Sequence, residues 1–401
     1  MPHPPSSATP TRRQASTIAR FLRSERASAL FLLGAAVLGL LLANSAVGPD
    51  LLAAKEAHIL GSELSLGHVI NDGLLTIFFF VVAIELAREF TIGEFSSLNR
   101  ALLPALAAVG GIAVPAGMYL MIISASGESS LNGGWPIPTA TDIAFALGIL
   151  ALFGSAIPMQ VRVFLLALAV LDDIIAILII AVFFTADVNL VLLGGAVAMM
   201  VIFALVSRLL RPHGASLLPQ WLIVLMLIVI GVLVWYLVYR SGVHATIAGV
   251  ALGLITPRGP AERVHRLLVP WSNVVVLPLF AFTAALVVIP RWGLTELSPA
   301  FWAITLALPV GKFIGITCVG GVSGIFAARH GRATLPAADL IMIGSLGGIG
   351  LTISLLMTEL AFSSSRELVD QGTLAVLLGS GISVVVATVL VSARSRHYAR
   401  Q

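Results

Sequence analysis

Residues 165–180 read LLALAVLDDIIAILII, so that two adjacent aspartates, Asp172 and Asp173, lie inside an unbroken run of apolar side chains. The whole apolar segment, 161–186, is longer than the roughly 20 residues that a helix needs to cross the hydrocarbon core of a bilayer. The aspartates occupy its middle. One aspartate at the centre of a membrane helix costs about 2.5–3.5 kcal/mol on insertion, so the pair indicates a functional site rather than packing.

The composition of the whole chain agrees with a location in the membrane. Of the 401 residues, 58% are hydrophobic and only 10% are charged, whereas about 25% of residues in soluble proteins are charged. The single cysteine, Cys318, excludes an internal disulfide and a cysteine-clustered metal site, and we expect no cofactor. The net charge of +4 comes from basic residues spread through short loops and tails, so nucleic acid is not an expected partner, whereas membrane lipid is.

The apolar windows predict the architecture. We expect an all-α integral membrane protein with twelve transmembrane helices in one transporter domain, 28–393, between a disordered cytoplasmic tail at 1–27 and a second cytoplasmic tail at 394–401. The first window is too long for the apolar region of a signal peptide and is expected to be retained. The windows are 28–47, 69–87, 101–124, 135–153, 161–186, 189–207, 219–239, 243–256, 270–289, 301–323, 337–361 and 372–393.

The distribution of basic residues predicts the orientation. With both termini in the cytoplasm, eighteen of the 23 lysines and arginines fall on the cytoplasmic side, as the positive-inside rule requires. Four fall outside and one, Lys312, lies in the middle of the tenth window. The four are Lys55, Arg240, Arg291 and Arg366.

Two of the windows carry helix-breaking residues at membrane depth. The fourth contains Pro136 and Pro138 followed by Thr139-Ala140-Thr141-Asp142, and the eleventh contains Gly344 to Gly350 with four glycines. In the predicted topology the third to fifth windows and the tenth to twelfth run in opposite senses, which predicts inverted repeats. Corresponding interruptions in two such repeats are typical of a transporter binding site.

The aspartate pair has the chemistry of a cation site. Carboxylate and carbonyl oxygens are the ligands of hard cations, and interrupted helices supply free carbonyls. Neighbouring residues on a helix point about 100° apart, so Asp172 and Asp173 are expected to differ in role. If sodium and protons compete for the same oxygens, binding of one expels the other, which is the basis of antiport. The metal ligands in this interpretation are Asp172 and Asp173, and the metal is the transported sodium.

Other charged residues extend the site. Lys312 either pairs with Asp172 and releases a proton when sodium displaces it, or neutralises the facing C-terminal dipoles of two broken helices. Asp142 suits the facing N-terminal dipoles of those helices. Thr141 or Asp142 suits an N-cap. Asp72 is a candidate for the ion entrance. Candidates for pH sensing at the helix ends are Glu85, Arg88, Glu89 and His244, although a structural role is the more usual one for such a histidine.

Seven short stretches in order give the chain a family resemblance. It resembles the NhaA-type sodium/proton antiporters, a family that is built from inverted repeats. The stretches are Asn71-Asp72-Gly73, residues 139–148, Leu171-Asp172-Asp173, residues 241–246, residues 278–282, Gly311-Lys312 and residues 348–352.

The resemblance implies a bacterial inner-membrane protein that exports sodium or lithium and imports more protons than it exports cations. It implies that Asp173 is the principal ion ligand and that Asp172 binds ion or proton and pairs with Lys312. Thr141 and Asp142 look like the crossing-point residues, Asp72 like an access-path carboxylate, and Glu85, Arg88 and Glu89 like part of a cytoplasmic pH sensor. Family members also form homodimers, here through about 48–66.

The chain departs from the family pattern at several positions. Before Pro270-Trp271 it has His265, Arg266 and Val269 where the family offers glutamate and histidines, so we expect the pH set-point or the sensing mechanism to differ. Ile174-Ile175 after the aspartates and Thr283-Ala284-Ala285 after Phe282 also differ, so ion preference can differ too.

Two other classes of protein also place carboxylates or broken helices in a membrane. An intramembrane aspartyl protease needs carboxylates on membrane helices, but the chain has no Gly-x-Gly-Asp element and such an enzyme does not need Lys312. A sodium-coupled symporter of an organic anion would use the N-termini of broken helices to hold its substrate, and Asp142 at that place argues against an anionic solute.

Overall fold

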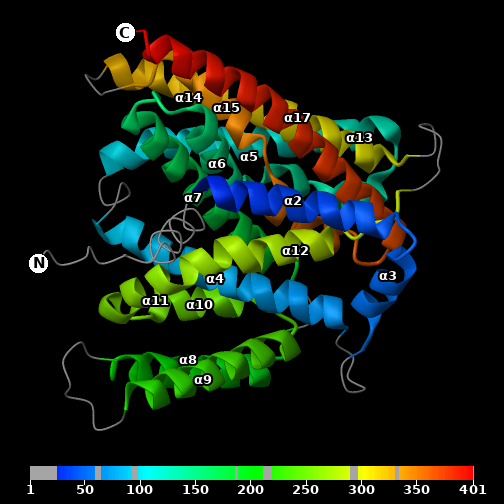
Figure 1. The fold of residues 1–401 in the computed structure, drawn as a ribbon, viewed down its shortest axis with the longest axis vertical. Helices are drawn as coiled ribbons and strands as arrows, with labels where there is room; N and C mark the ends of the chain where they lie inside the picture. Colours follow the sequence, from blue (N-terminus) through cyan, green and yellow to red (C-terminus); the bar gives the residue numbers. More distant parts are fainter. Residues whose placement is uncertain are drawn as a thin grey trace, which may run out of the picture.

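The computed structural model describes residues 25–58, 65–92, 98–185, 188–210, 219–289, 297–329 and 334–400, and in these ranges the fold is helical. Most helices run side by side along one direction, horizontal in Figure 1. One end of the bundle carries α3, and the other carries α11 and the C-terminus. We call these the α3 end and the α11 end. The predicted tail 1–27 lies outside the described residues except for its last three.

The element bounds overlap the predicted windows, except that α3 and η2 lie between windows and α11 begins twelve residues before the ninth. They are α2 Glu25–Ala43, α3 Gly48–Glu56, α4 Leu66–Ile92, α5 Leu98–Ser126, η2 Ser129–Gly134, η3 Ile137–Thr139, α6 Ile143–Phe153, α7 Met159–Phe183, α8 Leu190–Ser207, α9 Gln220–Arg240, α10 Thr246–Ile255, α11 Arg258–Trp271, η4 Ser272–Val276, α12 Leu277–Ala284, α13 Pro299–Leu306, η5 Ala307–Gly311, α14 Lys312–Arg329, α15 Ala337–Gly347, α16 Leu351–Ala361 and α17 Arg366–Tyr398.

The membrane class is confirmed, but the count of twelve spans is not. Among the described residues eight helices are long and apolar enough to cross a bilayer, and up to eleven if each bent pair is one span. Helix α10, in the predicted eighth window, has only 10 residues, which is half the length that a span requires. The windows therefore located the helices, whereas the number of complete crossings stays a prediction.

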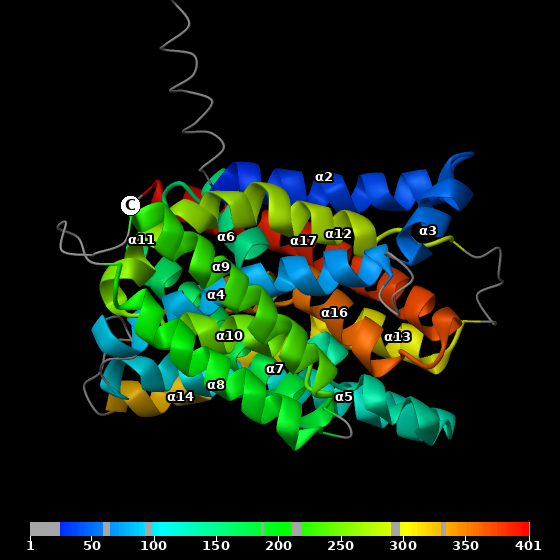
Figure 2. The same cartoon turned by 90° about the horizontal axis from the view of Figure 1, so that it is seen from below.

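The helices form two groups. The site group, α5–α7 with α13–α17, contains both predicted triplets of windows, and its members pack on one another through α5, α14 and α17. The flanking group consists of α3, α4 and α8–α12. Helix α2 contacts α6 on one side and α12 on the other and lies between the groups in Figure 1. The view from below in Figure 2 shows the same parallel course. Inverted symmetry between the triplets stays a prediction.

The interruptions predicted in the fourth and eleventh windows are present. The axis bends by 44° between residues 129–139 and α6, and by 47° between α15 and α16. The proline and glycine residues cause these breaks because proline lacks an N–H donor and glycine does not favour helix. The sequence did not reveal three other irregularities: a bend of 107° between α2 and α3, and the π-helical turns η4 and η5.

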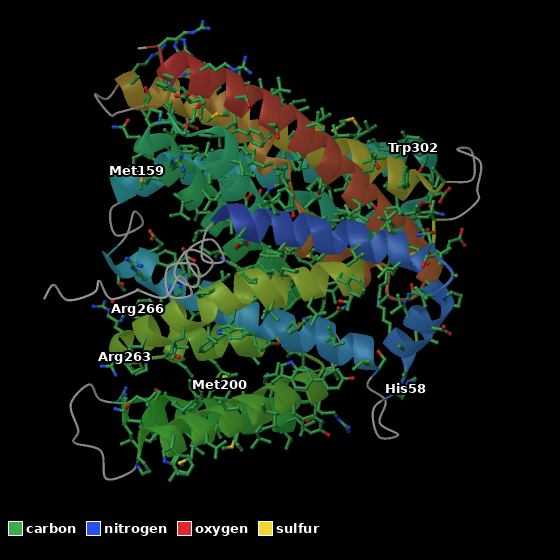
Figure 3. All side chains as sticks on the ribbon, viewed as in Figure 1. His58, Met159, Met200, Arg263, Arg266 and Trp302 are labelled. Atoms are coloured by element: carbon green, nitrogen blue, oxygen red, sulfur yellow. The ribbon has the colours of Figure 1, made fainter. Side chains whose placement is uncertain are left out.

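Several of the basic residues that the positive-inside rule assigns to one side lie together at the α11 end (Figure 3). Figure 3 shows Arg263 and Arg266 at the α11 end, and His58 and Trp302 at the opposite end. Helix α17 ends in the basic residues Arg396 and His397 at the α11 end. The asymmetry distinguishes the two faces of the bundle.

Close contact between the two interrupted spans needs a glycine at 350. A Cβ there would lie 2.6 Å from the carbonyl oxygen of Ala140 and 2.8 Å from the hydroxyl of Ser354. Neither main chain can move easily because both lie in the centre of the site group.

Gly350→Ala should therefore destabilise the folded protein by about 1–3 kcal/mol, the usual cost of overpacking. Thermal unfolding of the detergent-solubilised protein measures this. Gly34→Ala is the matched control, because a Cβ at Gly34 meets nothing within 4 Å. Equal melting temperatures for the two variants would contradict the close approach.

Candidate functional site

The two interrupted spans cross through their main chains. The amide of Asp142 donates to the carbonyl of Ile349 at 2.6 Å, which joins the extended segment before α6 to the one before α16. Helix α15 ends at Gly347 on the other side of this crossing. Both spans therefore expose a helix N-terminus and C-terminal carbonyls in the middle of the bundle.

Asp142 caps both helix N-termini. Its Oδ1 accepts from the amide of Phe145 at 3.0 Å, and its Oδ2 accepts from the hydroxyl and the amide of Thr352 at 3.0 and 3.3 Å. The carboxylate thus satisfies donors at the start of α6 and at the start of α16, and its charge is favourable beside two positive helix ends. This geometry matches the expected position of Asp142, and it identifies Asp142 rather than Thr141 as the N-cap.

Thr141 lies between the crossing and the ion-pair residues. Its Oγ1 is 2.9 Å from the carbonyl of Gly347 and 2.6 Å from Oδ2 of Asp172, and it accepts from Nζ of Lys312 at 2.6 Å. A hydroxyl has one proton to donate. The proton can therefore go to Gly347 or to Asp172, and the choice depends on whether Asp172 keeps its charge.

Asp172 and Lys312 form a buried ion pair. Nζ of Lys312 is 2.6 Å from Oδ2 of Asp172, and neither side chain is exposed. The structure thus places Lys312 against Asp172, as one of the two expected arrangements required. Lys312 follows the π-helical turn η5, which contains Pro309; such turns are frequent at functional sites because they displace the following residues.

Two sets of oxygen atoms beside this pair have no donor among the described residues. Oδ1 of Asp172 is buried and has no hydrogen-bond partner there. Asp173 is 2% exposed, and within the described ranges its carboxylate receives no hydrogen bond. Both residues lie on α7, next to the crossing through Thr141. These oxygens are available for a cation or a proton.

The balance of charges leads to the same conclusion. The described residues place Asp142, Asp172 and Asp173 in the interior with Lys312 as the ammonium group among them. An unpaired charge in a medium of low dielectric constant is costly, and Asp142 is offset by two helix ends and Asp172 by Lys312. Asp173 shares the attraction of Lys312, but within this part of the chain it forms no ion pair or hydrogen bond of its own. Protonation or a bound cation would remove the cost of this buried charge.

The remaining candidates lie away from this centre. Asp72 is buried on α4, with its Oδ1 3.9 Å from Nε2 of His244, whose Nδ1 lies 2.8 Å from the hydroxyl of Thr246. At the α11 end, Glu85 and Arg88 line a cavity of about 400 Å³ together with Arg266 and His265, while Glu89 is not among the lining residues. Nε2 of His265 is 3.9 Å from Oε2 of Glu85, so the structure brings a departure from the family pattern next to a candidate pH-sensing carboxylate.

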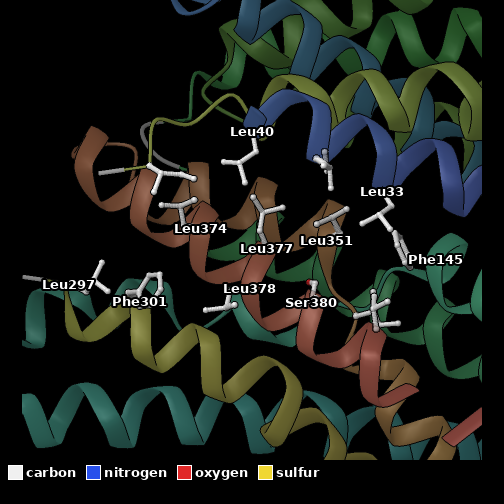
Figure 4. Close-up of a pocket in the computed structure, with 16 residues that line it drawn as sticks. Leu33, Leu40, Phe145, Leu297, Phe301, Leu351, Leu374, Leu377, Leu378 and Ser380 are labelled. Atoms are coloured by element: carbon white, nitrogen blue, oxygen red, sulfur yellow. The ribbon is translucent and has the colours of Figure 1, made fainter. Parts of the chain in front are cut away.

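An apolar cavity of about 650 Å³ lies beside the crossing. Figure 4 shows its lining, in which Leu33 and Leu40 of α2 face Leu377 of α17 and Leu351 of α16. Ser380 supplies the hydroxyl among the labelled side chains, and it accepts from the amide of Gly350 at 3.3 Å. The described residues that line the cavity include no charged side chain, so it is not a cation site.

Sequence reasoning missed a charged cluster between α15 and α17. Asp339 is fully buried and accepts from Arg394 and from the hydroxyl of Tyr398 at 2.8 and 2.6 Å. The signal was a single aspartate at the start of the eleventh apolar window. This cluster joins the C-terminal end of α17 to the N-terminal end of α15, the first half of an interrupted span.

The comparison with known proteins gives the family that the chain matches. Residues 19–391 match the family described as Na+/H+ antiporter 1. The protein named Na(+)/H(+) antiporter NhaA 2 of Clavibacter michiganensis subsp. michiganensis is 54% identical over 384 residues, which cover 94% of this chain and 93% of that protein. Na(+)/H(+) antiporter NhaA of Tropheryma whipplei (strain Twist) is 43% identical over 375 residues, 92% and 94% of the two chains.

Lys312→Met should destabilise the folded protein by about 3–5 kcal/mol, because it leaves the Asp172 carboxylate buried without its counter-ion. The double variant Asp172→Asn/Lys312→Met removes both charges and should recover a large part of that loss. Thermal unfolding in detergent compares the two, with Arg263→Met, which removes an exposed charge, as control. A double variant that is no more stable than the single one would contradict the pairing.

Proposed function

This chain belongs to the Na+/H+ antiporter 1 family and is therefore a secondary transporter of the inner membrane rather than an enzyme; on that premise we propose that it exports sodium or lithium in an electrogenic exchange for protons. The observation that carries the proposal is the buried Asp173 carboxylate, which forms no ion pair or hydrogen bond among the described residues, beside the free Oδ1 of Asp172.

In this proposal the cation binds between Asp173 and Asp172. Sodium prefers carboxylate, carbonyl and water oxygens, and the free Oδ1 of Asp172, the Asp173 carboxylate and the carbonyls at the ends of the interrupted helices are of this kind. When the cation enters, the Asp173 carboxyl releases a proton. The cation also weakens the attraction between Asp172 and Lys312, and the Lys312 ammonium releases a second proton as it becomes a neutral amine.

The exchange is then electrogenic. One positive charge enters the site for the two that leave, and on the return step the amine of Lys312 and the carboxylate of Asp173 take up protons from the opposite side. The membrane potential, inside negative, favours the net inward movement of positive charge. Competition of sodium and protons for the same groups couples the two movements without any other device.

Alternating access requires two arrangements of the same site. Main-chain and capping hydrogen bonds join the two interrupted spans at the crossing of Asp142 and Ile349. In this proposal the two spans tilt together about that point. We assign the α11 end, with its arginines, to the cytoplasm together with both termini. Asp72 then lies on the path to the outside, and Glu85 and Arg88 lie at the cytoplasmic entrance.

Other parts of the proposal rest on the family. A homodimer through about 48–66 would place α3 at the contact, although residues 59–64 are outside the described part of the chain. Glu85, Arg88, Glu89 and His244 remain the candidates for pH sensing. His265, which departs from the family pattern, lies beside Glu85.

Asp173→Asn should abolish sodium-driven proton movement in proteoliposomes, because an amide neither binds sodium as a carboxylate does nor exchanges a proton. Internal pH is recorded after a sodium gradient is imposed. Glu367→Gln, which neutralises an exposed carboxylate on α17, should exchange at the rate of the unaltered protein. Undiminished exchange by the folded Asp173→Asn variant would refute the site.

Sodium binding should weaken as the pH falls, because protons occupy the groups that hold the cation. The apparent dissociation constant should rise by up to about tenfold per pH unit for each proton expelled. Isothermal titration calorimetry between mildly alkaline and mildly acidic pH measures it, and the heat of buffer protonation counts the protons released. A dissociation constant that does not change with pH would contradict direct competition.

A further inference from the structure

Four polar side chains from four helices meet at the α3 end of the bundle. They are Lys55 of α3, Asn71 of α4, Thr283 of α12 and Glu359 of α16. We call them the α3-end cluster. Apart from Asn71, which is part of a family motif, nothing in the sequence brings these positions together, because they lie far apart along the chain.

Lys55 contacts both groups of helices. Its Nζ donates to the carbonyl of Thr283 at 3.0 Å and lies 3.9 Å from Oε1 of Glu359. The Lys55 side chain is only 10% exposed and that of Glu359 is 30% exposed. A charge pair that is partly withdrawn from water is screened less than a surface pair, so this contact holds the two helices more firmly than an exposed pair would.

Asn71 completes the cluster. Its Nδ2 donates to both carboxylate oxygens of Glu359 at 3.2 Å, and its Oδ1 accepts from the hydroxyl of Thr283 at 2.7 Å. Asn71 and Thr283 are buried, at 3% and 6% exposure. Glu359 therefore receives hydrogen bonds from one flanking helix and faces the ammonium group of another.

The position of Glu359 makes these contacts significant. Helix α16 is the half of an interrupted span that leads from the Asp142 crossing to the α3 end, and it belongs to the site group. Lys55, Asn71 and Thr283 all belong to the flanking group. The cluster therefore ties the two groups together at the α3 end, whereas the α11 end has the cavity lined by Glu85 and Arg88.

A second, weaker tie accompanies the cluster. Nη2 of Arg366, on α17, is 4.0 Å from Oε1 of Glu56, on α3, and both side chains are more than half exposed. Arg366 also lies 3.5 Å from Asp370 of its own helix. Exposed pairs of this kind contribute little to stability, but they show that α3 faces both α16 and α17 of the site group.

We propose that Lys55, Asn71, Thr283 and Glu359 form the gate that closes the outward path to Asp172 and Asp173, and that Glu359 must part from Lys55 and Asn71 in each transport cycle. The inference rests on the alternating access proposed above. Parting requires α16 to move relative to the flanking group, a rigid-body change of the kind that opens and closes transporters. Glu359 then gains water as a partner, which limits the free energy needed to open the gate.

Reversible cross-linking tests the gate. In a Cys318→Ser background, Lys55→Cys and Glu359→Cys are joined by a short thiol-reactive linker that a reductant cleaves. Sodium-driven proton movement in proteoliposomes should fall about tenfold or more on cross-linking and recover after reduction, because one arrangement is locked. The variant before cross-linking reports on the proposed exchange itself, so loss of exchange there is distinguishable from failure of the gate.

The control is a cross-link that leaves the two groups free. His58 and Ser65 face each other in an isolated antiparallel bridge between α3 and α4, so His58→Cys/Ser65→Cys joins residues within the flanking group. Its cross-linked form should exchange at the rate of the reduced form. If the cross-linked Lys55→Cys/Glu359→Cys variant also exchanges at the reduced rate, the gate is overturned.

A second pair guards against a variant that fails to fold. Glu56→Cys/Arg366→Cys replaces two exposed side chains that join α3 to α17, and its cross-link should reduce exchange to the same extent. Sodium binding by the cross-linked protein in detergent should persist, because the lock closes a path and leaves the site intact. Full exchange with this cross-link in place would overturn the gate independently of the first pair.

Discussion

A charge buried at the middle of a membrane must find a partner, and this constraint organises the centre of the molecule. Asp142 meets it with two helix N-termini, and Asp172 meets it with Lys312. Both solutions require unusual main chain: interrupted spans supply the free helix ends, and a π-helical turn precedes the lysine. The breaks in the helices and the charges at the centre therefore depend on one another.

Asp173 is the exception, because its carboxylate forms no hydrogen bond or ion pair of its own with a described residue. Its neighbours Asp142 and Thr141 already bind main-chain groups on both interrupted spans, and Lys312 lies within bonding distance of Thr141 and Asp172. The side chains that hold the crossing, Asp142 and Thr141, are thus different from Asp173, whose carboxylate has no hydrogen bond within the described residues. A change of ligand at Asp173 need not disturb the capping hydrogen bonds, whereas the ion pair of Asp172 is coupled to Thr141 directly.

Sequence reasoning located most of this centre and missed most of the periphery. Hydropathy identified the helices, and buried charge identified Asp172, Asp173 and Lys312, because hydrocarbon tolerates few exceptions. The contacts of Glu359 and of Asp339 depend on which helices pack together, and a single sequence does not contain that information. Helix α10 shows the same limit: the apolar window 243–256 predicted a membrane span, but the helix within it has only 10 residues.

The capping role of Asp142 has a consequence for how the family can diversify. The crossing is held by main-chain donors and by Asp142, Thr141 and Thr352. Within the described residues the oxygens of Asp173 form none of these hydrogen bonds. In the proposed exchange, substitutions around Asp173, such as those at Ile174-Ile175, can then alter the size and hydration of the proposed cation site while the crossing persists. On that proposal, natural selection can tune which monovalent ion is moved without rebuilding the helices around the crossing.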